Sequence, residues 1–519
     1  MSLLKRVNYR HLQVLNKCCR QNIKPKSLHT KSLVLSKQEK PRTVHLKSVQ
    51  SDSSLHFYQN KVLEEYTSQP VNPSTLRQFI FFGRQMNPER LITSANWVRN
   101  ELLVRLAHRI RDFQQLPFIV GTNPHIEYVY RLYWGAFETM RQFPPIRTES
   151  DNDAFCDLLR GLLEDGLLVL PKLARGLSES VAYYPPDQND LDLFLNRMLR
   201  SRISRRVLAE QHLALTEACE HQWDSTLGYG DGYVGIIFVH CSAQEIVKRA
   251  KSLVYQHIQK YHYQQQNQPL HAPNIEVSIH PNSRDSENEI LFAYIPEQLE
   301  HILYELLDNA VRFTMKRYPN ANYPPIKVTV SANDSDVYFR ISDQGGGMTK
   351  DRYERLWSYQ ARARTGDFDE IKEVEKLPTT VDGRANQVLQ MGHRHLGIGL
   401  TMSRIYAEYW GGELQIITMD GYGTDVYVRI PRLGTSIENL GIDYQTHPVF
   451  QDDQHQKLLL KKKDSKHTVK SSHKKQGIRL QSKPDKNLAA TKQKELLDTS
   501  LTSKSFSGSS WSESHMIRS

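Results

Sequence analysis

The sequence predicts a two-domain α+β protein in which a helical domain precedes a domain of mixed helices and strands. Apolar residues recur at three- and four-residue spacing from about residue 74 to residue 217, which is the period of helices. After Gly228 the pattern changes to short β-rich runs that alternate with helical stretches, which is typical of a helix-and-sheet sandwich. A length of 519 residues is sufficient for two or three domains.

The helical domain is expected to be a four-helix bundle. Trp97, Leu102, Leu106 and Ile110 recur on one face of its first helix. Prolines divide the later helices, and long helices with short breaks favour an antiparallel bundle. The later helices are predicted at residues 126–143, 151–164, 167–180 and 190–218.

The second domain is expected to hold seven short strands and two well-placed helices. The strands are predicted at residues 233–239, 275–279, 290–295, 326–332, 337–342, 413–418 and 424–430. The helices are predicted at residues 296–316 and 399–409. Residues 360–390, between the predicted strand 337–342 and the predicted helix 399–409, are expected to form a mobile lid.

The net charge of +11 is concentrated at the two ends of the chain. Residues 1–50 contribute +11 and residues 457–519 contribute +10, so the segment between them carries −10. A nucleic-acid-binding domain keeps its basic charge on the folded part, so no nucleic acid partner is expected. No run approaches 18 apolar residues, so no membrane span is expected.

The N-terminal 45 residues have the composition of an import signal. Residues 1–38 combine a rough apolar helical face with basic residues and hold no acid. This is the pattern of a mitochondrial transit peptide, with a disordered basic arm as the alternative. Residues 434–519, rich in Lys and Ser, are expected to form a disordered basic tail.

Three segments of the second domain carry groups suited to binding a nucleotide. On the predicted helix 296–316, Glu305 and Asn309 are four residues apart and share a face. A carboxylate and an amide oxygen in that arrangement can serve a Mg²⁺ ion that also takes phosphate oxygens.

The other two segments are rich in glycine. Asp343 ends a predicted strand and is followed by Gly345, Gly346 and Gly347, so it can accept a hydrogen bond from an exocyclic amine while the backbone turns tightly. Residues 395–400 lead into a helix, and the N–H groups of a glycine-rich helix start suit phosphate.

Taken together, the three segments resemble the N, G1 and G2 boxes of the Bergerat-type ATP-binding fold shared by gyrase B, Hsp90, histidine kinases and MutL. Residues 101–110 and 116–124 are similar to the first helices of the mitochondrial kinases of the pyruvate and branched-chain 2-oxoacid dehydrogenase complexes. These two N-terminal segments look closest to the branched-chain kinase. The resemblance covers about residues 70–433, but it does not choose between the two complexes.

The resemblance implies a mitochondrial matrix kinase that transfers the γ-phosphate of Mg-ATP to a Ser of the dehydrogenase E1α subunit and thereby inactivates the complex. It also implies docking of the E2 lipoyl domain on the helical domain, and a homodimer. The implied boundaries are 1–45 for the transit peptide, 46–232 for the helical domain, 233–433 for the ATPase domain and 434–519 for the tail.

The resemblance also implies a role for each candidate residue. Glu305 matches the general base, Asn309 the Mg²⁺ ligand, and Arg312 an arginine of the nucleotide-binding segment. Asp343 matches the adenine-reading acid and Thr424 a contact near adenine. The remaining nucleotide-binding positions are Gly345, Gly347, His395, Leu396, Gly397, Ile398, Gly399 and Leu400.

Several positions depart from the family pattern. Gly166 stands where the family has a His thought to tune the base, and Asp308 replaces the usual Lys beside Asn309. The lid's Ser-Thr pair corresponds to residues 362–363, here Arg and Ala, and His395 replaces the first glycine of the G2 box. Two alternatives therefore stay open: an autokinase of the histidine-kinase type, and a catalytically weak pseudokinase that binds the E2 core.

Overall fold

The computed structural model describes residues 53–441 apart from short gaps, and all of them belong to one compact unit that ends at Ile442. The gaps are residues 85, 186–189, 221–231, 267–270, 283–284, 286–288, 320–321, 367–370, 372 and 391–396. The predicted transit peptide at 1–45 lies outside the described residues, as does the predicted tail from residue 442 onward.

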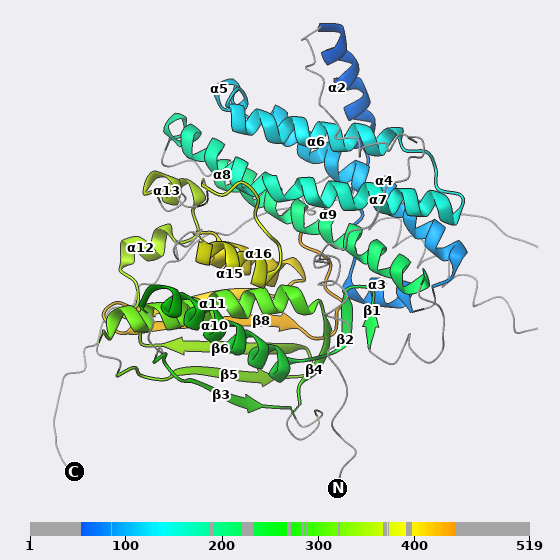
Figure 1. The fold of residues 1–519 in the computed structure, drawn as a ribbon. Coiled ribbons are helices and arrows are strands. Elements are labelled where there is room, and N and C mark those ends of the chain that lie inside the picture. The colour runs from blue at the N-terminus through cyan, green and yellow to red at the C-terminus, as the bar shows by residue number, and fades with distance from the viewer. Residues whose placement is uncertain are drawn as a thin grey trace, which may run out of the picture. The chain divides into compact units, whose positions relative to one another are not determined.

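The N-terminal part is helical, as predicted, and its long helices lie side by side (Figure 1). The helices are α2 (Ser53–Thr67), α3 (Leu76–Gly83), α4 (Pro88–Gln114), α5 (Phe118–Gly121), α6 (Pro124–Gln142), α7 (Glu149–Asp165), α8 (Val169–Ser180) and α9 (Asp190–Glu220). Two 3-10 turns accompany α8, η1 (Gly166–Leu168) and η2 (Val181–Tyr183). Helix α4 packs against α6 and α9, and α6 packs against α8, which gives the predicted four-helix core, while α7 lies against α4 and α9.

Local signals in the sequence set where these helices begin. Asn87 accepts a hydrogen bond from the Arg90 amide, 2.8 Å away, and Pro88 takes the first helical position of α4. Thr148 starts α7 with a reciprocal capping box to Asp151. Each cap satisfies amide groups that have no partner within the helix, so the breaks between helices are short and defined.

The C-terminal part is built on a five-stranded sheet of order β3-β5-β6-β8-β7. Its strands are β3 (Ile275–His280), β5 (Ile326–Ala332), β6 (Asp336–Asp343), β7 (Glu413–Met419) and β8 (Gly423–Pro431). Only the β3–β5 pair is parallel; the other pairs are antiparallel. Strand β6 alternates buried Val337, Phe339 and Ile341 with more exposed residues, so one face of the sheet is apolar.

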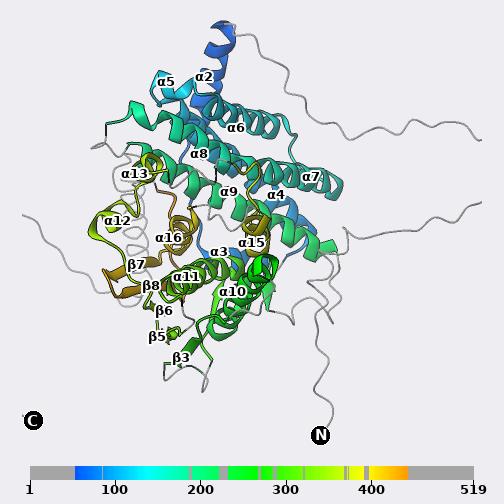
Figure 2. The same ribbon diagram turned by 60° about the vertical axis from the view of Figure 1, so that its left-hand side comes forward.

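Helices cover that apolar face and separate the sheet from the helical domain (Figure 2). The covering helices are α10 (Ala243–Gln266), α11 (Pro296–Arg317) and α16 (Gly399–Tyr409), and α15 (Val381–Gln390) lies on α10 and α11. Helix α11 packs on β6, α16 packs on β7 and β8, and α16 also contacts α9 of the helical domain. The result is the sandwich that the alternating pattern of the sequence predicts.

A smaller sheet of order β1-β2-β4 lies beside this layer, and its strands differ from the prediction at one place. The run 233–239, predicted as a single strand, is divided into β1 (Tyr233–Val234) and β2 (Ile237–Ser242), which pair antiparallel. Gly235 has φ +62 at the turn, a conformation that glycine adopts readily, and this turn divides the run. The third strand is β4 (Leu291–Tyr294).

Two segments whose composition predicts mobility or disorder hold regular structure or packing contacts in their described residues. Residues 360–390, predicted to be mobile, include helix α15 and most of α13 (Tyr359–Arg364), and α12 (Lys350–Arg355) precedes them. The predicted start of a disordered tail at residue 434 is wrong, because residues 434–441 pack on the folded unit. Within them, Glu438 is 1% exposed and its Oε1 atom lies 2.5 Å from Nη2 of Arg105 on α4.

In the part of the chain that the structure describes, no helix is long and apolar enough to cross a membrane.

Candidate functional site

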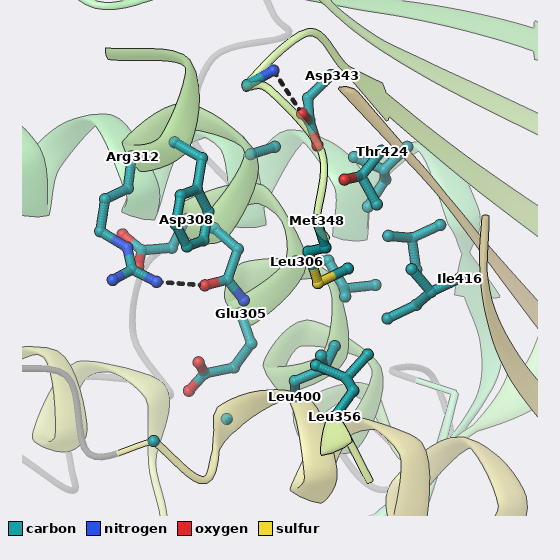
Figure 3. A pocket seen from close by; sticks show the side chains of 18 of the residues that line it. Glu305, Leu306, Asp308, Arg312, Asp343, Met348, Leu356, Leu400, Ile416 and Thr424 are labelled. Atoms are coloured by element: carbon teal, nitrogen blue, oxygen red, sulfur yellow. Dashed lines mark hydrogen bonds between the residues drawn. The ribbon is translucent and has the colours of Figure 1, made fainter. Parts of the chain in front are cut away.

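A cavity of about 680 Å³ opens between helix α11, the ends of strands β6 and β8, and the lid segments α13 and α15. This volume suits a nucleotide-sized ligand. Figure 3 shows Glu305 and Arg312 on one side of the cavity and Asp343 and Thr424 on the other. The two groups of polar residues thus mark two ends of one site.

Helix α11 positions the first group because its ends and its buried face are well specified. Pro296 takes the first helical position. The last turn carries Lys316 and Arg317, whose positive charges interact favourably with the negative end of the helix dipole. Ile302, Leu303 and other apolar residues are buried on one side of the helix. The polar face of the same helix then lines the cavity.

The carboxyl group of Glu305 is partly enclosed, with 22% of its side chain exposed. Burial raises the pKa of Glu305 to about 7, with a further rise from Asp308, while the charges of Arg384 and Arg312 oppose the increase. Burial likewise raises the pKa of Asp308 to about 6 against the charge of Arg312. Glu305 is therefore poised to take up and release a proton near neutral pH.

Asn309 lies one turn after Glu305, and its Oδ1 accepts a hydrogen bond from Nη2 of Arg312 at 2.6 Å. The Nε atom of Arg312 is buried and has no hydrogen-bond partner among the described residues. Burial lowers the pKa of Arg312, while Asp308 and Glu305 raise it. This end of the cavity therefore combines an amide oxygen with a cation that still has a donor to offer.

His301 and Arg384 complete the surroundings of Glu305. The Nδ1 atom of His301 lies 3.9 Å from Oε1 of Glu305, beyond hydrogen-bond distance. Nη1 of Arg384 lies 3.1 Å and 3.2 Å from the two ring nitrogens of His301. Burial, reinforced by Arg384, lowers the pKa of His301 well below its usual value, so its ring is neutral at pH 7.

The other end of the cavity is an apolar slot with one acid, Asp343. Asp343, at the end of β6, accepts a hydrogen bond from the Gly345 amide at 2.7 Å. Burial raises the pKa of Asp343 despite backbone hydrogen bonds from Gly345 and Thr424. Apolar side chains form the remaining walls of this end: Leu306, Ile341, Met348, Ile416 and Val426. A planar heterocycle with an exocyclic amine fits such a slot.

Glycines hold the backbone close to the cavity at two places. Gly347 has φ +66, and a Cβ there would overlap the carbonyl oxygen of Met419. A Cβ at Gly399 would overlap the carboxyl group of Glu305. Helix α16 begins at Gly399, so the start of this helix lies against the carboxyl group of Glu305.

The residues present fit a bound Mg-nucleotide. The slot with Asp343 suits an adenine, and the helix start at Gly399 suits phosphates. The carboxylate of Glu305 and the amide oxygen of Asn309 are ligand types that Mg²⁺ takes together with water and phosphate oxygens. Buried nitrogens on Arg312 and Arg384 that have no partner in the described part of the chain leave donors available for an anion.

The structure brings together every predicted site residue that it describes. Two predicted nucleotide contacts, His395 and Leu396, lie outside the described residues. The residues that line the cavity are Glu305, Asn309, Arg312, Asp343, Gly345, Gly347, Gly397, Ile398, Gly399, Leu400 and Thr424.

Sequence reasoning missed His301 and Arg384. His301 precedes Glu305 by four residues on α11, and this helical spacing could have indicated it. No spacing in the sequence indicates Arg384, because the fold of the lid segment brings this residue to the cavity. At the departure Gly166, the first residue of η1, a Cβ would meet nothing within 4 Å.

Two family models match the two parts of the chain. The model described as histidine kinase-, DNA gyrase B- and HSP90-like ATPase matches residues 294–434. The model described as mitochondrial branched-chain alpha-ketoacid dehydrogenase kinase matches residues 73–238. The molecule is thus a helical domain joined to an ATPase domain of the histidine-kinase type, a class of domain that binds ATP.

Curated relatives extend the match over most of the chain. Pyruvate dehydrogenase (acetyl-transferring) kinase 2, mitochondrial, of Saccharomyces cerevisiae is 30% identical over 447 residues, covering 75% of this chain and 88% of the yeast protein. The corresponding mitochondrial kinase of Arabidopsis thaliana is 29% identical, covering 70% and 92%. Isozyme 1 of Homo sapiens is 28% identical, covering 72% and 80%. The chain belongs to the mitochondrial pyruvate and branched-chain dehydrogenase kinase family.

Proposed function

We propose that the chain is an active mitochondrial protein-serine kinase that phosphorylates the E1α subunit of a 2-oxoacid dehydrogenase complex with Mg-ATP. The observation that carries the proposal is the arrangement on α11, where Glu305, Asn309 and Arg312 line one end of a nucleotide-sized cavity. Phosphoryl transfer requires mainly positioning and charge neutralisation, and this arrangement offers both.

Glu305 is the proposed general base. With a pKa raised by burial to about 7, its carboxylate is a stronger base than an exposed glutamate and is about half ionised at neutral pH. It would accept the hydroxyl proton of the target Ser. The neutral ring of His301 and the guanidinium group of Arg384, which lie against each other, are its neighbours.

The remaining residues would hold the nucleotide. Asp343 would accept a hydrogen bond from the adenine amine, beside Thr424, and the amide groups of residues 397–400 would donate to phosphates. Asn309 would hold Mg²⁺, which when bound neutralises phosphate charge. Its hydrogen bond to Arg312 would be exchanged for the metal.

Pyruvate dehydrogenase E1α is the first substrate to test, because the three curated relatives above are named as pyruvate dehydrogenase kinases. The branched-chain E1α is the second, because the model of that kinase matches residues 73–238. Family membership also supports a matrix location after removal of residues 1–45, docking of an E2 lipoyl domain on the helical domain of residues 46–232, and a homodimer. The ATPase domain would then span residues 233–433.

The experiment incubates the purified chain with each E1α subunit and γ-³²P-ATP, with Asn309→Ala as the metal-site variant. We expect acid-stable label on a Ser of one E1α and a loss of that label in the variant. Acid-labile label on the chain itself would instead indicate an autokinase of the histidine-kinase type. ATP binding without transfer to either subunit would indicate a pseudokinase.

A further inference from the structure

Arg384 is held in the cavity with an unused hydrogen-bond donor. Its side chain is 5% exposed, and its Nε atom donates to the carbonyl oxygen of Pro378 at 2.8 Å. Its Nη1 atom faces His301, as described above. Its Nη2 atom is buried and has no hydrogen-bond partner among the described residues. Arg384 and its neighbour Ala385 line the same cavity as Glu305.

An unpartnered donor on a buried guanidinium group is costly. Leaving a buried polar group without a hydrogen-bond partner lowers stability, and does so more for a charged group. Native structures keep such groups mainly where a ligand, ion or water completes them. The buried Nε of Arg312 is in the same condition. Two arginines, from α11 and from α15, therefore offer unused donors in one cavity and both influence Glu305.

The position of Arg384 in the cavity indicates which part of a ligand it would meet. Asp343 and Thr424 mark the opposite end, where the walls are apolar (Figure 3). The charge of Arg384 acts on the carboxyl group of Glu305. That carboxyl group lies against Gly399 at the start of α16, where phosphates are expected. Guanidinium groups bind phosphate oxygens through charge-assisted hydrogen bonds.

We propose that Arg384 binds the terminal phosphate of the nucleotide and thereby makes the site prefer ATP over ADP. This inference rests on the proposed function, because it assumes that the cavity binds a nucleotide. The residue is supplied by the lid rather than by the sheet or α11. It therefore adds a contact that the N, G1 and G2 segments of the sequence do not provide.

Contacts to the helical domain hold the lid segment that carries Arg384. The amide of Leu377 donates to the carbonyl oxygen of Leu167 at 3.0 Å. Arg206 on α9 donates to Oγ1 of Thr379 at 2.9 Å. These contacts fix the path of the chain before α15, so the guanidinium group is placed in the cavity before a ligand arrives. Such preorganisation lowers the cost of binding.

The test compares the affinity of the full chain for Mg-ATP and for Mg-ADP by calorimetry, without a protein acceptor. In Arg384→Gln we expect the affinity for ATP to fall about 10- to 100-fold, the loss of a hydrogen bond to a charged group. The affinity for ADP should change by less than about threefold, since ADP lacks the terminal phosphate. Retained ADP binding also shows that the variant folds.

Two further variants sharpen the result. Arg384→Lys should recover part of the ATP preference, because it restores the charge without the planar fork. Lys376→Gln removes a positive charge from the same lid segment but outside the cavity, where Lys376 pairs with Glu164 at 2.8 Å, and should leave the ATP-to-ADP ratio unchanged.

Equal losses for ATP and ADP in Arg384→Gln, or unchanged affinity for both, would overturn the role of Arg384 while leaving nucleotide binding intact. If the wild-type chain binds neither nucleotide, the proposed function fails and this inference fails with it.

Discussion

Two buried clusters of charged side chains in this molecule differ in how completely their hydrogen bonds are satisfied. The first joins α4 to the segment at residues 434–441. Nη2 of Arg105 lies 2.5 Å from Oε1 of Glu438, and Nε of Arg105 lies 2.9 Å from Oε1 of Glu101. The remaining N–H groups of Arg105 donate to the carbonyl oxygen of Asn72, to Oγ of Ser204 and to Oε2 of Glu438.

The second cluster surrounds Glu305 in the nucleotide cavity. Here Nε of Arg312 and Nη2 of Arg384 have no partner among the described residues. Burial lowers the pKa of Arg105, but the two carboxylates outweigh it and raise the value, so the first cluster favours the charged state. In the second cluster, burial raises the pKa of Glu305 to about 7, so its charge is disfavoured.

The difference separates charge that stabilises the fold from charge that awaits a ligand. The first cluster is complete within the chain and connects α4, α9 and the segment that follows β8. In the second cluster, two arginine nitrogens lack a partner among the described residues, and the proposed phosphate contact would satisfy one of them. The comparison predicts that changes in the first cluster reduce stability, whereas changes in the second reduce binding or transfer.

The largest expected effect is a loss of stability in Glu438→Ala. Removing Glu438 breaks a buried ion pair and leaves Glu101 as the remaining carboxylate partner of Arg105, which costs about 3–5 kcal/mol. The measurement is the free energy of unfolding in urea, read at the main transition. An equal stability of variant and wild type would show that the first cluster does not stabilise the fold.

Glu305→Gln is the matched control in the second cluster. The pKa of Glu305 is raised in the folded state, so the ionised carboxylate lowers stability once the pH exceeds the unfolded value near 4.5. At pH 8 the variant should therefore be at least as stable as the wild type. A loss comparable to that of Glu438→Ala would erase the distinction between the clusters.

A smaller effect is expected at the apolar end of the cavity. Asp343→Ala removes the acceptor for the adenine amine, a hydrogen bond to a charged group worth about 1.5–3 kcal/mol. Affinity for ATP and for ADP should fall together, about 10- to 100-fold, because both carry adenine. Calorimetry with GTP as a comparison checks this. A variant that binds both adenine nucleotides normally would contradict the assignment of Asp343.

The smallest effect is on the pH dependence of transfer. Glu305 faces His301, Asp308 and Arg312 from its own helix and Arg384 from α15. Because the base must be ionised, kcat/KM should be half-maximal near pH 7 and fall about tenfold per unit below it. In Arg384→Gln a cation that lowers the pKa is gone, so the acid limb should move to higher pH. A flat profile between pH 5.5 and 8 would contradict a titrating Glu305.

The site residues whose position at the cavity could be predicted from the sequence are those whose geometry is local. Glu305 and Asn309 share a helix face by spacing alone, and Asp343 with its glycines follows directly from a strand end. The helices at residues 296–316 and 399–409 and most strands could be predicted for the same reason. Hydrophobic periodicity and the Gly or Pro residues that end an element are both short-range signals.

The residues that the sequence did not predict depend on contacts distant along the chain. Glu438 lies in a segment with the composition of a tail, and its burial depends on Arg105, 333 positions earlier. Arg384 reaches Glu305 only because residues 377–379 are attached to the helical domain. Neither contact produces a periodic pattern in the sequence. The positions of Glu438 and Arg384 therefore depend on tertiary packing, which the sequence pattern does not reveal.

The central claim is that Glu305 is the base for transfer of phosphate to a Ser of E1α. The most direct measurement is single-turnover transfer from γ-³²P-ATP to pyruvate dehydrogenase E1α by the wild type and by Glu305→Gln, each saturated with nucleotide. The account predicts phosphoserine in the wild-type reaction and a rate about 10²–10⁴-fold lower in the variant, with ATP still bound. Transfer by Glu305→Gln at the wild-type rate would contradict it.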